Sequence, residues 1–308
     1  MKKLFEKISR LNSKDLPMVE SIVDKFLTGN EDFENEDNYF DKINKKALIH
    51  QLLLGDHVTA IVVEAENGTL AVHPQDMVVG MLLREHGAYG IGEIQKIKSF
   101  LTNKSKVLIV GAHVGAIVVP IAKCCREVVA IEANPFTYKL LTSNIKINGI
   151  NNCRTYNIAA NDKKEQLRFY CSKVNSGGSK RKPAINDYAY VYDAPEEINV
   201  NAMELDELLE NEVFDLITMD IEGSEYFALK GMAKLIKGAK VLFIEFIPHH
   251  LIKVANITVD DFLDPLKAFE TMLIPSRNLE VEKEDFRTVL QFMMEEDITE
   301  DNLIFIRN

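Results

Sequence analysis

From residue 106 onward, short apolar runs alternate with helix-like segments, and this alternation limits the fold more than any other feature of the chain. The runs KVLIVG, EVVAIE, FDLITMD and KVLFIEF begin at Lys106, Glu127, Phe214 and Lys240. A strand that is apolar along its whole length is buried on both faces, and helices between such strands allow them to run parallel. We therefore predict an α/β fold with a doubly wound, Rossmann-like and mostly parallel sheet.

The segments before residue 106 predict a different organisation. Residues 1–55 are expected to form a helical N-terminal extension, because their apolar residues recur at spacings of three and four. Asn67 and Gly68 stand between two β-prone runs and predict a β-hairpin, since both tolerate positive φ. Helix-like segments follow at 76–85 and 92–101. We divide the chain into the extension of residues 1–55, a hairpin with helices that flank a pocket at 56–105, and a Rossmann-like domain at 106–308.

The connections in the third region differ in character. We expect helices over 114–125, 135–148 and 224–236, and a last strand begins at Asn302. The segment 172–187 has no apolar periodicity, and a loop of this length in an α/β domain is mobile or functional. Its Lys-Arg-Lys cluster is predicted to be a solvated loop face, with binding of an anionic substrate as the alternative.

The charge balance excludes several partners. The chain has 36 Lys and Arg against 47 Asp and Glu, a net charge of −11, and its one dense basic cluster is Lys180–Lys182. We therefore expect no nucleic acid partner. The longest apolar stretch, Val107–Ala122, is shorter than the roughly 20 residues of a membrane span. The start of the chain lacks the apolar run of a secretory signal, so we expect a cytoplasmic protein without a membrane partner. Four cysteines without CxxC spacing predict neither a metal site nor a disulfide framework.

Two glycines and one glutamate predict a nucleoside pocket. A strand ending at Gly111 turns and enters a helix near Gly115, which places backbone N–H groups where a polar ligand can approach. Glu132 ends the next strand about 20 residues further on, where a carboxylate can accept hydrogen bonds from ribose hydroxyls. A βαβ crossover with incidental glycines is the alternative interpretation.

The residues between these glycines discriminate between two cofactors. A dinucleotide fingerprint needs a second glycine where the pyrophosphate touches the backbone, and this chain has His113 there. Ala116 is acceptable at the third glycine position. S-adenosylmethionine carries no phosphate, so the spacing favours this cofactor over NAD.

Five segments, in order, resemble one family. VGAHVG, IEANP, NIAANDKKE, LITMDIEGSEYFALKG and VLFIEF resemble the FkbM family of S-adenosylmethionine-dependent class I methyltransferases, whose members act mostly as O-methyltransferases on sugars and natural products. The resemblance covers about residues 56–308, and DIEGSE is its most specific part. It implies methyl transfer from S-adenosylmethionine to a hydroxyl of a small molecule or glycan, with S-adenosylhomocysteine as the product.

The resemblance also implies site residues. Asp220 would lie closest to the transferred methyl group. The residues expected to bind the cofactor are Gly111, Ala112, His113 and Gly115 beside the methionine part, Glu132 and Asn134 at the ribose, Asn157 and Ala159 at the adenine edge, Asp220, and Tyr89 and Glu93 from the preceding helices.

One position departs from the family. Ile109 stands two residues before the first glycine, where the family usually has an acidic residue. A carboxylate that would organise water or the cofactor amine is therefore missing. A non-catalytic nucleoside-binding or interaction protein on the same fold remains an alternative, and an NAD-linked dehydrogenase is a less favoured one.

A proton acceptor is the further need of methyl transfer to a hydroxyl. The candidate catalytic residues are Asp220, Glu245 and His249, with Glu222 and His250 as further candidates. A histidine titrates near neutrality, whereas a carboxylate at a strand end can orient the substrate instead. Helix-dipole stabilisation alone would explain Glu222. The N-terminal region is expected to flank the pocket or to mediate formation of a homodimer.

Overall fold

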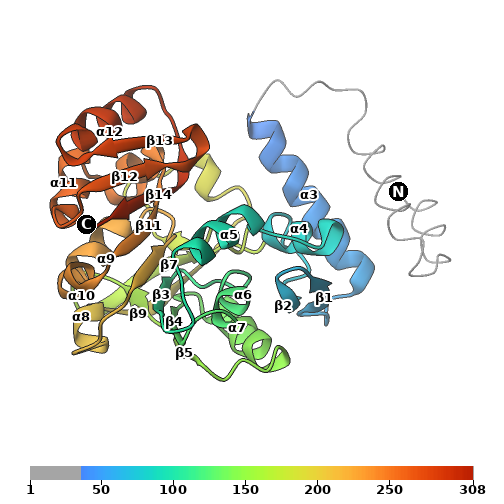
Figure 1. The fold of residues 1–308 in the computed structure, drawn as a ribbon. Coiled ribbons are helices and arrows are strands. Elements are labelled where there is room, and N and C mark those ends of the chain that lie inside the picture. Colours follow the sequence, from blue (N-terminus) through green and yellow to red (C-terminus); the bar gives the residue numbers. More distant parts are fainter. Residues whose placement is uncertain (1–35, 308) are drawn as a thin grey trace.

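An eight-stranded sheet forms the centre of the computed structural model, which describes residues 36–307 (Figure 1). In spatial order its strands are β13 (Leu279–Glu282), β12 (Thr271–Ile274), β14 (Glu300–Ile306), β11 (Val241–Phe246), β10 (Leu216–Met219), β3 (Lys106–Val110), β4 (Glu127–Ile131) and β5 (Cys153–Tyr156). The five strands from β11 to β5 run parallel. Strands β14, β12 and β13 pair antiparallel and extend the sheet at one edge. The predicted α/β fold with a mostly parallel sheet is confirmed.

Two smaller sheets and a set of helices surround this sheet. The hairpin consists of β1 (Ile61–Ala65) and β2 (Gly68–Val72), and the other small sheet of β6 (Ala159–Ala160), β7 (Glu165–Cys171), β8 (Lys180–Arg181) and β9 (Glu196–Met203). The α-helices are α3 (Glu36–Leu54), α4 (Val79–His86), α5 (Ile91–Ser99), α6 (Val118–Ala122), α7 (Pro135–Ile147), α8 (Leu205–Leu208), α9 (Glu225–Gly231), α10 (Ala233–Gly238), α11 (Val259–Leu263) and α12 (Phe286–Glu295). A π-helix spans His250–Ala255.

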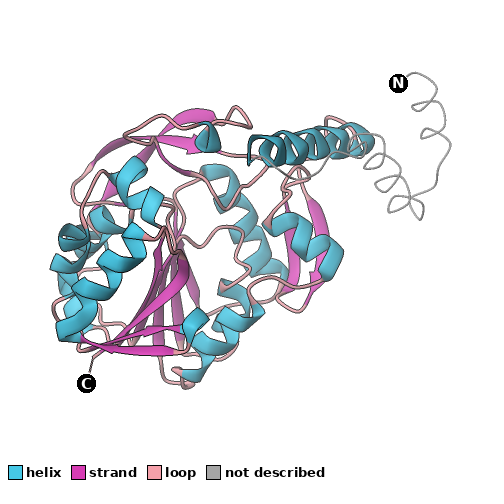
Figure 2. Ribbon diagram, turned by 90° about the horizontal axis from the view of Figure 1, so that it is seen from above, coloured by secondary structure: helices cyan, strands magenta, loops and turns pink. Residues whose placement is uncertain are grey.

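Helices cover both faces of the central sheet, as the view in Figure 2 shows. Successive side chains of a strand point to opposite faces. Along β3, Leu108 and Val110 therefore pack with helices α9 to α12, whereas Val107 and Ile109 pack with α5, α6 and α7. This division explains why the strand is apolar from Val107 to Val110.

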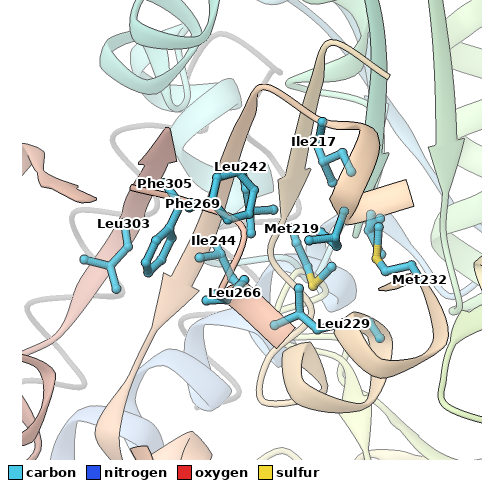
Figure 3. Packing of buried hydrophobic residues seen from close by; sticks show 14 of the residues in the cluster. Ile217, Met219, Leu229, Met232, Leu242, Ile244, Leu266, Phe269, Leu303 and Phe305 are labelled. Carbon is cyan, nitrogen blue, oxygen red and sulfur yellow. The ribbon is translucent and has the colours of Figure 1, made fainter. Parts of the chain in front are cut away.

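Apolar side chains packed between the sheet and helices α9 to α12 hold the ends of the central strands in place. Figure 3 shows Met219 of β10 near Leu229 and Ile244 of β11 near Leu266, and all four are at most 1 % exposed. Burying one such side chain contributes about 1.5–3 kcal/mol. This packing therefore stabilises the strand ends that border the site.

Helix α6 is shorter than the helix predicted over 114–125. Turns occupy residues 113–117, and the helix begins only at Val118. Gly115 has φ +91°, a value outside the helical region, so the turn continues past it. The helix predicted over 224–236 is likewise divided into α9 and α10 at Met232, which has φ −133°.

The predicted hairpin is confirmed, but its turn lies one residue earlier. Ala65 pairs with Gly68, so Gly68 belongs to β2 and has φ +125°. The Asn67 side chain is buried and donates to the carbonyl oxygens of Tyr89 and Ala116, at 2.7 and 2.9 Å. Asn67 therefore joins the hairpin to the segment before α5 and to the glycine-rich turn.

The prediction of a solvated loop at Lys180–Lys182 is wrong for its first two residues. They form β8, which pairs with β7, and both Lys180 and Arg181 are 8 % exposed. The Arg181 guanidinium lies 3.6 Å from the centre of the Phe227 ring. Burial is tolerated because each cation has a partner inside the protein, a feature that local composition does not show.

The N-terminal extension is described only in part. Helix α3 forms its last portion, and the prediction for residues 1–35 lies outside the described residues. The division of the chain into three regions stays a prediction. Within residues 36–307, no helix is both long and apolar enough to cross a membrane.

Candidate active site

A cavity of about 730 Å³ opens where strands β3 and β10 end. The strand order reverses here, because β4 and β5 lie on one side of β3 and β10 and β11 on the other. Loops that leave such a point in opposite directions form a ligand crevice. Gly111 is required at this point: it has φ +90°, and a Cβ on it would lie 1.8 Å from the carbonyl oxygen of Asp220.

The structure brings together most of the predicted site residues. Those that line the cavity are Tyr89, Glu93, Gly111, Ala112, His113, Glu132, Ala159, Asp220 and Glu245, and Ile109 lines it as well. Those that do not line it are Gly115, Asn134, Asn157 and His249. The roles of all these residues stay predictions.

Three of the residues that do not line the cavity stabilise the elements that form its wall. A Cβ on Gly115 would lie 2.9 Å from the Leu141 side chain, so this glycine allows α7 to pack closely. Asn134 caps α7 by accepting the N–H of Phe136 at 2.9 Å. The Asn157 side chain donates to the carbonyl oxygen of Glu132 at 2.8 Å.

The position of His249 does not support its predicted role in catalysis. Its Nδ1 lies 2.7 Å from the Tyr190 hydroxyl. Burial and the nearby Lys180 ammonium lower the pKa of His249 below its usual value. The ring is therefore turned toward Tyr190, outside the cavity wall, and is a weaker base than a solvated histidine.

The Glu132 carboxylate is held by three donors of the protein. Its Oε1 accepts the N–H of Asn134 at 2.8 Å and the Thr137 hydroxyl at 2.9 Å, and its Oε2 accepts the N–H of His113 at 2.7 Å. Burial raises the pKa of Glu132, and these hydrogen bonds oppose that effect. A carboxylate oxygen can accept two hydrogen bonds, so Oε2 retains one acceptor site for a ligand hydroxyl.

A hydrogen-bonded chain links His113 to two residues that the sequence analysis missed. His113 Nε2 lies 2.6 Å from the Ser176 hydroxyl, and that hydroxyl donates to the Asp76 carboxylate. Asp76 and Ser176 are both buried. Because the serine donates to the carboxylate, the histidine nitrogen is assigned as the donor to the serine, which leaves Nδ1 as an acceptor in the neutral ring. Ser176 lies in the segment 172–187, for which the sequence analysis predicts a mobile or functional loop without naming a residue.

Carboxylates from the ends of β10 and β11 form the opposite side of the cavity. Glu222 pairs with the Lys180 ammonium at 2.7 Å, and Glu245 Oε2 lies 3.2 Å from His250 Nδ1. The Asp220 carboxylate accepts no hydrogen bond from residues 36–307 and is exposed to the cavity. The protein around the cavity shields Asp220 and Glu245 from bulk water, and this desolvation together with the neighbouring carboxylates raises the pKa of both well above the usual range.

His250 is a poor candidate for the base. It is buried, and burial together with the Lys180 ammonium lowers its pKa far below that of a free histidine. Lys180 Nζ lies 3.3 Å from its Nε2, which identifies this nitrogen as an acceptor. His250 is therefore a neutral link between Glu245 and Lys180.

Comparison with protein families decides the class of protein. The model of the methyltransferase FkbM domain matches residues 110–297. The chain belongs to the FkbM methyltransferase family. The predicted family is confirmed, and S-adenosylmethionine, predicted from the sequence, is the cofactor of this family. A comparison with curated proteins gives no match.

Three solved structures are similar to this chain at low sequence identity. The FkbM methyltransferase from Methylobacillus flagellatus KT is 14 % identical, with a TM-score of 0.39 over 87 % of this chain and 57 % of that one. Trm5b from Pyrococcus abyssi is 16 % identical, with a TM-score of 0.34 over 62 % of this chain and 42 % of that one. The chain thus spans about half the length of these two proteins. M. jannaschii TYW2, solved in complex with AdoMet, is 15 % identical, with a TM-score of 0.36 over 81 % of this chain and 87 % of that one.

The glycine-rich turn of this chain fits a cofactor without phosphates. The N–H groups of Gly111 and Ala112 both donate to the carbonyl oxygen of Ile131, and that of Gly115 donates to the Ala112 carbonyl. Together with the His113 N–H, which Glu132 accepts, these donors are already used. A diphosphate would need them, whereas the uncharged ribose of S-adenosylmethionine needs the open acceptor site on Glu132. The residues present therefore fit this cofactor.

The β14 side of the cavity was not predicted from the sequence. Glu300, Asp301 and Asn302 line the cavity from the start of β14, facing Glu93 of α5. Burial raises the pKa of Glu93 to about 7, and a hydrogen bond with the Asn302 side chain opposes the shift. The sequence analysis predicted the last strand from its apolar residues alone and placed its start at Asn302. It therefore did not identify the two acidic residues before Asn302 as part of the site.

The acidic side of the cavity is not assigned to a metal ion. Asp220, Glu222 and Glu245 each place a carboxylate oxygen within 4.8 Å of the others, a set that can hold a cation. Lys180 already supplies a positive charge to Glu222. Acidic groups this close occur without an ion, and the sequence predicts no metal site.

Proposed function

We propose that this protein methylates a hydroxyl group of a small molecule or glycan, with S-adenosylmethionine as the methyl donor. One observation carries the proposal. Glu132 and Asp220 face the same cavity from the ends of β4 and β10, across a turn whose backbone donors are used internally. This arrangement offers one side for a nucleoside and leaves a free carboxylate on the other.

The residues of the chain have separate tasks in this reaction. When bound, S-adenosylmethionine would supply an electrophilic methyl group, whose carbon–sulfur bond is the one that would break on transfer to the acceptor oxygen. Gly111 and Ala112 allow close approach, and Glu132 Oε2 holds a ribose hydroxyl. The Asp220 carboxylate receives the hydroxyl proton of the acceptor, and its raised pKa makes it a better base near neutral pH.

Binding and turnover test the proposal separately. Calorimetry with S-adenosylhomocysteine, S-adenosylmethionine and NAD is expected to give binding of the first two only. Absence of binding by both would contradict the proposal, and binding of NAD with an absorbance change during turnover would favour a dehydrogenase. Tight binding of S-adenosylmethionine without methylation of any compound in a broad acceptor panel would favour a non-catalytic nucleoside-binding protein. Ile109 lines the cavity at a position where the family usually has an acidic residue, and this observation favours the second function.

A further inference from the structure

His113 is held at both its backbone and its ring. It has φ +47°, a left-handed conformation that few residues with a side chain adopt, and its N–H donates to the Glu132 carboxylate at 2.7 Å. Its Nε2 lies 2.6 Å from the Ser176 hydroxyl, which donates to the Asp76 carboxylate. The imidazole ring therefore has a defined orientation before a ligand binds.

The chain from Asp76 through Ser176 to His113 is not needed to join the loops that carry these residues. The Met77 N–H already donates to the Val174 carbonyl oxygen at 2.8 Å and ties the same two loops together. Asp76 and Ser176 are 1 % and 5 % exposed. A buried carboxylate that acts through a hydroxyl on one ring nitrogen determines which nitrogen carries the proton.

The other ring nitrogen of His113, Nδ1, is accessible from the cavity. It has no hydrogen-bond partner among residues 36–307, and Arg84 Nη1 is the one fully enclosed side-chain nitrogen or oxygen of that range without a partner. Nδ1 is therefore not enclosed, and the histidine lines the cavity with 15 % of its side chain exposed. Because Nε2 carries the proton, Nδ1 presents a lone pair and accepts a hydrogen bond.

The turn that carries His113 lies between the two ends of the proposed reaction site. A Cβ on Gly111 would contact the Asp220 carbonyl oxygen, and the His113 N–H is bonded to Glu132. In the proposed function Glu132 holds the ribose and the methyl group faces Asp220. The amino-acid part of the cofactor is the third branch on its sulfur, and the ammonium is the one group of that branch that donates hydrogen bonds.

We propose that Asp76 and Ser176 are positioning residues, which hold His113 in the tautomer whose Nδ1 accepts a hydrogen bond from the ammonium group of S-adenosylmethionine. The N–H groups of residues 111–113 all donate within the protein, so this part of the turn has no donor for the carboxylate of the cofactor. An acceptor beside used donors selects the ammonium instead. This inference rests on the proposed function.

Three ligands test whether the ammonium is recognised. Calorimetry compares S-adenosylhomocysteine, its analogue without the amino group, and 5′-methylthioadenosine, which lacks the whole amino-acid part. S-adenosylhomocysteine is expected to bind at least about tenfold more tightly than the deaminated analogue, because a hydrogen bond from a charged group is stronger than one between neutral groups. Equal binding of these two ligands would overturn the inference.

Asp76→Asn is expected to reverse the chain without removing it. Asp76 Oδ1 accepts the Val78 N–H at 2.9 Å, so the amide oxygen takes that place and the amide nitrogen donates to Ser176. The serine hydroxyl then donates to His113 Nε2, and the ring proton moves to Nδ1. The preference for S-adenosylhomocysteine over the deaminated analogue should be lost, with unchanged affinity for 5′-methylthioadenosine. Asp56→Asn, at an exposed position, is the control and should keep the preference. A preference that survives in Asp76→Asn would place the ammonium on another acceptor and overturn the inference.

Nitrogen-15 NMR of labelled histidine reads the tautomer directly, at about pH 8, where a free imidazole is neutral. The signals of His113 are those missing from His113→Asn. In the wild type Nε2 should carry the proton and Nδ1 none, and in Asp76→Asn this pattern should be reversed. A role in folding alone would not exchange the two nitrogens. Protonation of Nδ1 in the wild type, or a pattern that Asp76→Asn leaves unchanged, would overturn the inference.

A second pair of variants serves if Asp76→Asn does not fold. Ser176→Ala removes the link and should lower the preference for the amino group, whereas Ser176→Thr keeps a hydroxyl and should retain the preference. Equal preferences in these two variants would overturn the positioning role. If the wild type binds neither S-adenosylhomocysteine nor 5′-methylthioadenosine, the proposed function fails together with this inference. Binding of S-adenosylhomocysteine without a preference for its amino group defeats this inference alone.

Discussion

Two carboxylates at neighbouring strand ends differ in how the protein satisfies them. Glu132, after β4, accepts three hydrogen bonds from its own chain, whereas Asp220, after β10, accepts none from the described residues. The first is fixed in one orientation before a ligand arrives. Asp220 has no hydrogen-bond donor among the described residues, and a ligand can supply one. The cavity therefore has a preorganised side at Glu132 and an open side at Asp220.

The close contact between these two sides gives the largest expected effect. In Gly111→Ala the new Cβ would lie 1.8 Å from the Asp220 carbonyl oxygen, at a residue with φ +90°. Overpacking and backbone strain together should cost about 3 kcal/mol or more of the free energy of unfolding. Chemical denaturation measures this loss.

Gly92→Ala is the matched control for that substitution. A Cβ there has no neighbour within 4 Å, and the residue lies in α5. Alanine is expected to stabilise the protein by about 0.5–1 kcal/mol. If Gly111→Ala is as stable as this control, the strand ends can separate without cost and the cavity is not preorganised.

Lys180 is a buried cation that balances the charge of the carboxylates on the open side. Lys180→Met removes the cation from Glu222 and brings uncompensated charge next to Asp220, so we expect a loss of about 3 kcal/mol in denaturation at pH 7. Lys182→Met, two residues on, breaks only an exposed pair with Glu197 and should cost far less stability. Equal losses in both variants would show that Lys180 does not balance the acidic side.

These two lysines also show where sequence-based prediction ends. Both stand in one Gly- and Ser-rich segment, and local composition predicts the same solvated state for both. Their environments differ because Lys180 meets Glu222, which lies 42 residues away in the sequence. A pairing of this kind follows from the register of β8 and is not contained in the segment itself.

The strand ends, by contrast, were predictable. Gly111, Glu132 and Asp220 each follow a continuous apolar run, and parallel strands bring their carboxyl ends to one edge of the sheet. Asp76 and Ser176 were not predictable, because they come from loops 100 residues apart and hydrogen-bond to each other only in the folded chain, beside the His113 side chain. The sequence therefore predicts the part of the site that the sheet places, and misses the part that the loops place.

The preorganised side is tested by Glu132→Gln. An amide nitrogen in place of one oxygen would face a backbone N–H, leaving two donors opposed, which should cost about 2 kcal/mol of stability. Affinity for S-adenosylhomocysteine should fall at least about tenfold, since a charged acceptor is lost. Glu127→Gln, at the other end of β4, breaks partly exposed ion pairs and should leave this affinity unchanged. Unchanged binding in Glu132→Gln would mean that the ribose lies elsewhere.

The smallest effect concerns protons on the open side, where the pKa of Glu93 is about 7 in the folded protein against 4.5 for a free glutamate. Between these pH values the folded state holds a proton that the unfolded state has released, so this carboxyl contributes stability that is complete below about 4.5 and is lost as the pH rises through 7. Stability of the ligand-free protein should therefore fall from pH 5 to pH 8. In Glu93→Gln the fall should be smaller by of order 1 kcal/mol, because the amide does not titrate and water in the cavity screens part of the shift. Glu280→Gln, at an exposed position on β13, should keep the full pH dependence, and an identical curve for Glu93→Gln and the wild type would show that the Glu93 side chain is already ionised and solvated near neutral pH.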